Sequence, residues 1–123
     1  GTSRTKGEYM KKNYNEFLGE ISTSLAMMGK EMHDVMKGFG MLVQGATKDG
    51  ALSKKHKELI ALALGVAAHC EGCIAHHTHS LVELGTTRAE LLETLGMAVV
   101  MGGGPSVMYA MSAIKAFEDF GGK

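Results

Sequence analysis

Two cysteines three residues apart are the side chains of this sequence best suited to chemistry. They lie in the stretch Cys70-Glu71-Gly72-Cys73-Ile74-Ala75-His76-His77. A Cys-x-x-Cys spacing brings two sulfur atoms close enough to form a disulfide, and a position at the start of a helix favours the thiolate through the helix dipole. The pair therefore predicts a redox-active dithiol. A metal site and two small buried residues are the alternatives.

The helical phase of this segment adds a histidine to the pair. At about 100° per residue, Cys70, Cys73 and His77 fall within an arc of about 60° on one helix face. Leu81 and Leu84 continue that face, so the sulfur atoms and the imidazole are expected to point inward. His77 follows Cys73 by one turn, where it could accept the thiol proton or hold the thiolate as an ion pair.

Zinc binding is the main chemical alternative to redox chemistry. Cys70, Cys73 and His77, with His76 or His69, could supply three or four ligands. A structural zinc site usually takes its second pair of ligands from a distant segment, but the chain has no other cysteine. Redox chemistry is therefore favoured, and neither a metal nor another cofactor is expected.

Helices are expected almost throughout the chain. Ser53 is a candidate N-cap, Thr87 and Glu90 have the spacing of a capping box, and Pro105 suits the first turn of a helix. No segment shows the period-two alternation of a strand. The sequence predicts an all-α protein with about six helices, at about residues 7–17, 32–45, 53–68, 70–84, 87–101 and 105–120.

The composition is that of one helical domain spanning residues 1–123. Thirteen basic and thirteen acidic residues cancel, which removes the usual argument for a nucleic-acid or anionic-membrane partner. Ten methionines and no tryptophan suit closely packed helices. The uncharged run from Thr94 to Ile114 is interrupted by Gly102-Gly103-Gly104-Pro105, so neither half could span a bilayer. We expect a soluble, cytoplasmic protein.

Uncharged helices are too numerous for one small subunit to bury. The two last predicted helices and the middle of the third carry almost no charge. Small domains keep a large share of their surface exposed, and exposed apolar faces usually indicate association. A homo-oligomer is therefore favoured over a tight monomeric bundle.

A longer pattern extends beyond the cysteine segment. Lys57-Glu58-Leu59-Ile60-Ala61-Leu62-Ala63 is followed by the cysteine pair and then by His77. This pattern resembles the carboxymuconolactone decarboxylase superfamily, specifically its alkylhydroperoxidase D-like branch. The segment from Gly102 to Ser106, with Met108-Tyr109, is also similar to that family, and the resemblance covers roughly residues 50–117.

The resemblance implies an orthogonal-type helical bundle that assembles as trimers or hexamers and acts as a thiol-dependent peroxidase. Cys73 would be oxidised to sulfenic acid, Cys70 would be the resolving thiol, and His77 and Glu58 would form the relay that deprotonates Cys73. The substrate would be a hydroperoxide or a disulfide, and a lipoyl or thioredoxin-like dithiol would be the reductant. The alternatives are a disulfide reductase or electron-transfer subunit, and a non-enzymatic redox-sensing or zinc-binding oligomer.

The residue before the second cysteine departs from the pattern of some family members. Some members carry a histidine immediately before the second cysteine, where this chain has Gly72. The lactone decarboxylases of the superfamily lack the cysteine pair, so that activity is not expected.

Glu58 is too far from the cysteines on a straight helix. Twelve residues would separate it from Cys70 by about 18 Å. Either the chain bends between Leu64 and His69, with Gly65 a weak point, or a neighbouring subunit supplies the carboxylate. The order of attack is also open, because the first cysteine of such motifs is often the more acidic one.

Overall fold

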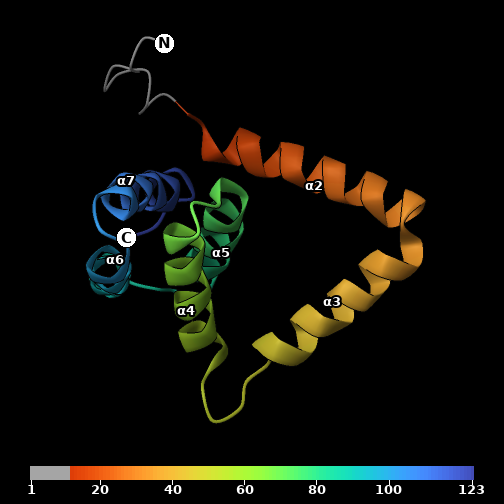
Figure 1. Ribbon diagram of the computed structural model, residues 1–123, viewed down its shortest axis with the longest axis horizontal. Coiled ribbons are helices and arrows are strands. Elements are labelled where there is room, and N and C mark those ends of the chain that lie inside the picture. Colours follow the sequence, from red (N-terminus) through yellow and green to blue (C-terminus); the bar gives the residue numbers. More distant parts are fainter. Residues whose placement is uncertain (1–11) are drawn as a thin grey trace.

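The computed structural model describes residues 12–123, and this part of the chain folds as helices joined by short turns, without a strand (Figure 1). The all-α prediction is therefore confirmed. The described helices are α2 (Tyr14–Glu31), α3 (His33–Thr47), α4 (Lys54–Ala67), α5 (Glu71–Glu83), α6 (Arg88–Gly102) and α7 (Gly104–Asp119).

The helix starts carry the caps that the sequence predicted. The Ser53 side chain accepts the backbone N–H of His56 at the start of α4. Thr87 and Glu90 form a complete capping box at the start of α6. Glu90 also pairs with Lys55 of α4 at 2.6 Å, and the hydrogen bonds from Lys55 and then Thr87 lower the pKa of Glu90 to about 2. This cluster fixes the start of α6 beside the start of α4.

The N-terminal helix differs from the prediction. The expected helix at residues 7–17 lies partly outside the described residues, and α2 begins only at Tyr14. Asn13 caps it by accepting the backbone N–H groups of Asn15 and Glu16. The helix then continues to Glu31, across a segment for which no helix was predicted, because Leu18 opens a stripe of apolar residues at helical spacing.

Helices α4 to α7 pack together as the body of the molecule. Every pair among these four helices except α5 and α6 shares extensive contacts. Their fully buried large apolar side chains are Leu62, Val66, Ile74, Leu81, Leu91 and Phe117. The first half of α2 is attached to this body by a second cluster, in which Tyr14, Phe17 and Ile21 pack with Ala75 and Ala116.

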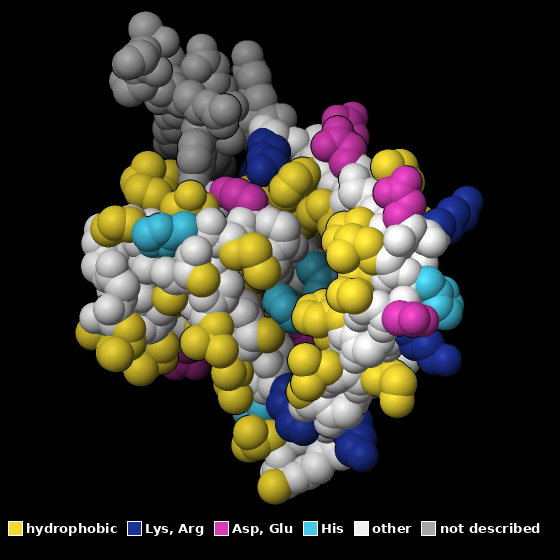
Figure 2. All heavy atoms as spheres, turned by 45° about the vertical axis from the view of Figure 1, so that its right-hand side comes forward, with side chains coloured by type: hydrophobic (Ala, Val, Ile, Leu, Met, Phe, Trp, Pro, Cys, Tyr) yellow, Lys and Arg dark blue, Asp and Glu magenta, His cyan; other side chains and the backbone are white. Residues whose placement is uncertain are grey.

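Residues 22–47, the second half of α2 together with α3, form what we call the arm. Figure 1 shows α2 running away from the body and α3 returning toward the start of α4. The arm exposes many large apolar side chains, namely Leu25, Met27, Met28, Met32, Val35, Phe39, Met41 and Leu42. Figure 2 shows hydrophobic side chains on both sides of a hollow beside the arm, with histidine side chains visible inside it.

The body also leaves apolar side chains uncovered. Leu64 of α4 is 64% exposed, and Val100 and Met101 of α6 are 69% and 81% exposed. The apolar section of α4 is therefore buried on one side only. Among residues 12–123, no helix is long and apolar enough to cross a membrane.

Candidate active site

The turn between α4 and α5 brings the two ends of the predicted site together. Helix α4 ends at Ala67, and His69 follows with a φ of +58°, in the left-handed region. Two hydrogen bonds close the helix end, from the N–H of His69 to the carbonyl of Val66 (3.1 Å) and from the N–H of Cys70 to the carbonyl of Gly65 (2.9 Å). The chain thus bends after α4, within the interval where one of the two alternatives required it.

Gly65 is not the weak point that the sequence suggested. It lies inside α4 and is buried, and the bend comes at Ala68 and His69. A glycine near a helix end is as well suited to close packing as to breaking the helix, and here its Cα faces Cys73.

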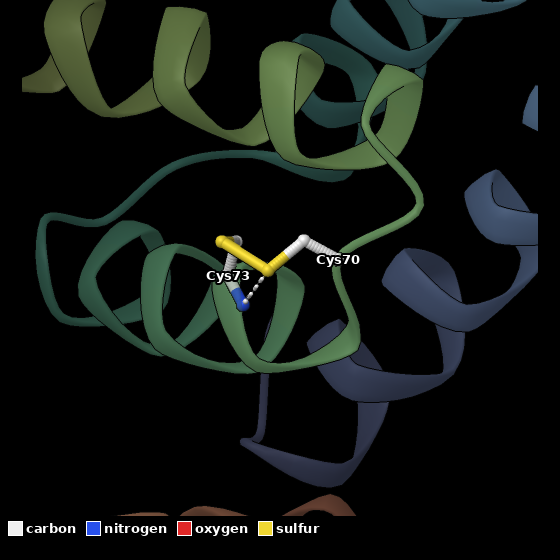
Figure 3. Close-up of a disulfide and its surroundings, with 2 residues drawn as sticks. All are labelled: Cys70 and Cys73. Carbon is white, nitrogen blue, oxygen red and sulfur yellow. Dashed lines mark hydrogen bonds between the residues drawn. A yellow bond between two sulfur atoms is a disulfide. The ribbon is translucent and has the colours of Figure 1, made fainter. Parts of the chain in front are cut away.

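Cys70 and Cys73 form a disulfide with a Cα–Cα distance of 5.3 Å (Figure 3). Cys70 is the N-cap of α5, with extended backbone angles, and its Sγ accepts the N–H of Cys73 at 3.2 Å. The expectation that Cys70 shares a helical face with Cys73 was therefore wrong, because Cys70 precedes the helix. Leu81 is fully buried as expected, whereas Leu84 is 38% exposed because it caps the end of α5.

Glu58 and His77 meet within the same chain. The His77 Nδ1 lies 2.6 Å from Oε2 of Glu58, and the Glu58 side chain is only 5% exposed. An ionised carboxylate only accepts hydrogen bonds, so the Nδ1–H of His77 donates to Glu58 and leaves Nε2 for another partner. The structure places all four predicted site residues on α4, α5 and the turn between them.

Comparison with known proteins agrees with this arrangement. The sequence profile of the carboxymuconolactone decarboxylase family matches residues 33–116. The chain belongs to this family. The superfamily resemblance based on the Glu58, cysteine and His77 pattern is thereby confirmed.

Several proteins match this carboxymuconolactone decarboxylase family protein over most of their length, and one of them has a solved structure with the same fold. A family member from Legionella pneumophila, whose crystal structure is of the apo form, is 60% identical with a TM-score of 0.85, and the match covers 87% of this chain and 96% of that one. An uncharacterized protein of Cupriavidus necator is 38% identical over 82% of this chain and 89% of its own length. An uncharacterized protein of Haemophilus influenzae is 29% identical over 86% and 94%.

His76 and His69 lie beside the candidate site, and His79 follows on α5. The ring of His76 contacts that of His77 edge-on at 4.9 Å. Partial burial, and then the neighbouring His77, lower the pKa of His76, although the charge of Glu58 acts in the opposite direction. His69 stacks on Tyr109 with 4.7 Å between ring centroids, and the Nε2 of His79 lies 3.6 Å from Oε1 of Glu83.

Sequence reasoning missed the role of Glu71, between the two cysteines. Its carboxylate accepts hydrogen bonds from the hydroxyl groups of Tyr14 (3.0 Å) and Ser112 (3.1 Å), and Lys12 lies 3.4 Å away. This network ties α2 and α7 to the first turn of α5. No local pattern could reveal it, because the partners are 57, 41 and 59 residues away along the chain.

The zinc alternative gains no support from the side-chain positions. Within residues 12–123, histidine, cysteine, aspartate and glutamate side chains nowhere gather in threes in a way that could hold a metal ion. His69 stacks on Tyr109, and the Nδ1 of His77 is engaged by Glu58.

Proposed function

We propose that the protein is a thiol-dependent peroxidase of the alkylhydroperoxidase D-like branch, with Cys73 as the attacking sulfur. The observation that carries this proposal is the 2.6 Å contact between His77 and the buried Glu58, one helical turn beyond a cysteine that forms a disulfide with its neighbour. A base oriented by a carboxylate and placed near a thiol is the arrangement that activates a sulfur nucleophile.

Glu58 and His77 divide the work of deprotonation. Glu58 fixes the tautomer of His77 by accepting the Nδ1–H, so that Nε2 is free to take the proton of Cys73. The imidazolium that forms is stabilised by the buried carboxylate and in turn favours the Cys73 thiolate.

The catalytic cycle then has three balanced steps. The Cys73 thiolate attacks the outer oxygen of a hydroperoxide, the O–O bond breaks, and the alcohol leaves with the proton that His77 returns. Cys70 attacks the Cys73 sulfenic acid, which forms the disulfide and releases water. An external dithiol, lipoyl or thioredoxin-like, reduces the disulfide by two thiol exchanges and is itself oxidised to a disulfide.

Disulfide exchange is the second candidate function. Cys70 stands at the N-cap of α5, where backbone N–H groups and the helix dipole stabilise a thiolate. A nucleophile in this position suits attack on a disulfide of a partner, with Cys73 completing the exchange. The two functions use the same residues and differ in the oxidant and in the sulfur that attacks first.

We also propose that the protein works as a homo-oligomer, a trimer or hexamer, in the cytoplasm. The support for assembly is the apolar surface of the arm, since monomeric soluble proteins rarely expose so many large apolar side chains together.

Stopped-flow oxidation of the reduced protein tests the function. We expect hydroperoxide to oxidise the dithiol faster than a protein disulfide does; the reverse order would favour the second candidate.

Cys73→Ser should abolish reaction with peroxide, and Cys70→Ser should leave a trappable sulfenic acid. A sulfenic acid that is trapped only in Cys73→Ser would reverse the assignment. If hydroperoxide and the protein disulfide both oxidise the protein no faster than they oxidise a small dithiol in solution, the enzyme proposal is wrong.

A further inference from the structure

We propose that Gly65 is a positioning residue of this site: by allowing α5 to approach α4 closely at Cys73, it places Cys73 and His77 in register with Glu58. The inference rests on the proposed function for its effect on catalysis. Its effect on the geometry of the site is measurable independently of any peroxide.

The contact between Gly65 and the two cysteines is the first observation. A Cβ atom at position 65 would lie 3.0 Å from the Cβ of Cys73, and 3.8 Å from both the carbonyl carbon of Cys73 and the nitrogen of Ile74. The carbonyl of Gly65 accepts the N–H of Cys70 at 2.9 Å. One residue of α4 thus touches both members of the dithiol.

The helical spacing links this contact to the relay. Gly65 follows Glu58 by seven residues, which is about two turns on the same face of α4. On α5, His77 follows Cys73 by four residues, about one turn on the same face. Since Gly65 faces Cys73 and Glu58 faces His77, the two helices run in opposite directions along one shared interface.

The separation of the helices at Gly65 therefore sets the separation at the relay. A methyl group at position 65 would have to push the backbone of α5 away by a few tenths of an ångström, because the atoms it would meet are backbone atoms and a Cβ rather than the end of a flexible side chain. The Glu58–His77 hydrogen bond is short, at 2.6 Å, and each partner is attached to one of the two helices, so the bond lengthens when the helices move apart. We expect the added methyl group to lengthen this bond.

Gly65→Ala tests the proposal, with Gly96→Ala as the matched control. Gly96 lies in the middle of α6, and a Cβ there would meet nothing within 4 Å. For Gly65→Ala we expect the proton NMR signal of the His77 Nδ1–H to move upfield, the thiolate fraction of Cys73 to fall, and oxidation by hydroperoxide to slow by about tenfold. Gly96→Ala should leave all three unchanged.

A double variant distinguishes positioning from a general loss of stability. If Gly65 acts through the relay, Gly65→Ala should cause no further loss of Cys73 thiolate once Glu58→Gln has removed the carboxylate charge. Full additivity, or an unchanged His77 signal in Gly65→Ala, would overturn the proposal. Should Gly65→Ala unfold, the same comparison is made in the Gly96→Ala background, where the extra alanine favours the helix.

The proposed function can fail without this inference failing. If the wild-type dithiol does not react with hydroperoxide, the peroxidase proposal is wrong. The His77 signal and the thiolate fraction would still show whether Gly65 sets the geometry.

Discussion

Burying a carboxylate costs free energy unless hydrogen bonds replace the lost water. The Glu58 side chain is 5% exposed, and its Oε2 lies 2.6 Å from the Nδ1 of His77. The pair is therefore a local unit in which each side chain needs the other, and the imidazole is held in one orientation. At the scale of single residues, this unit is the basis of our proposal that the dithiol is reactive.

His77→Ala is the direct test of that unit. In the proposed mechanism the imidazole of His77 takes the proton of Cys73, so its removal should leave a smaller thiolate fraction at neutral pH. Oxidation by hydroperoxide should slow by about a hundredfold. Thiolate absorbance and stopped-flow fluorescence or mass spectrometry measure the two quantities.

His79→Ala is the matched control, because His79 lies on the same helix but pairs with Glu83 instead. It should change the oxidation rate by less than about twofold. If His77→Ala keeps the thiolate fraction and the rate of the wild type, His77 has no part in the relay.

The residues that sequence alone could locate are those whose partners are near in the chain. Cys70, Cys73 and His77 lie within eight residues, so their spacing predicted a common site, although helical periodicity applies only to Cys73 and His77 because Cys70 precedes α5. Glu58 needed a family pattern, because its approach depends on the bend after α4. The close contact of Gly65 and the network of Glu71 depend on how helices pack, which no spacing encodes.

At the scale of elements, the turn between α4 and α5 also depends on a contact with a residue far along the chain. Its left-handed residue is His69, at a position where glycine is the usual residue. The stack of the His69 ring on Tyr109 of α7 offsets the backbone strain, at 4.7 Å between ring centroids and 7° between planes. The turn that delivers Cys70 to α5 is thus held by an element from the other end of the chain.

Two substitutions at His69 should separate the backbone from the ring. His69→Gly relieves the strain but loses the stack, so we expect the free energy of unfolding to change by less than about 1 kcal/mol. His69→Val loses the stack and keeps the strain, so it should lower the free energy of unfolding by about 2 kcal/mol. Denaturant unfolding at one fixed protein concentration measures both.

Ala68→Val provides the control for the valine side chain, since Ala68 has right-handed backbone angles. It should cost no more than the difference in helix propensity, about 0.6 kcal/mol. Equal losses in His69→Val and Ala68→Val would contradict the strain at position 69.

Element boundaries were predictable where a cap or a breaker marks them. Ser53, Thr87 and Pro105 stand at or within the first turn of helices that the structure contains. The start of α2 was not predicted, because Asn13 was not recognised as its N-cap. The arm as a projecting unit could not be predicted, since an amphipathic helix does not reveal whether its own body or another subunit covers it.

At the scale of the whole molecule, the arm is the feature whose apolar side chains a single chain leaves exposed. Its apolar side chains continue around the hollow beside the body (Figure 2). Val35, Phe39 and Leu42 lie at helical spacing along one side of α3 and are 61%, 56% and 66% exposed. Covering this stripe in a second copy would remove apolar surface from water, which is the main driving force of subunit association.

Leu42→Lys should therefore disrupt the proposed homo-oligomer. A lysine in the middle of a buried apolar contact cannot keep its charge hydrated, so we expect a smaller particle than the wild type at the same micromolar concentration. Gln44→Lys is the matched control, because Gln44 is exposed on the same helix about 200° around its axis. Size-exclusion chromatography with light scattering gives the mass relative to one 13.1 kDa chain. A monomeric wild type, or an equal mass for the two variants, would show that the arm stripe does not hold subunits together.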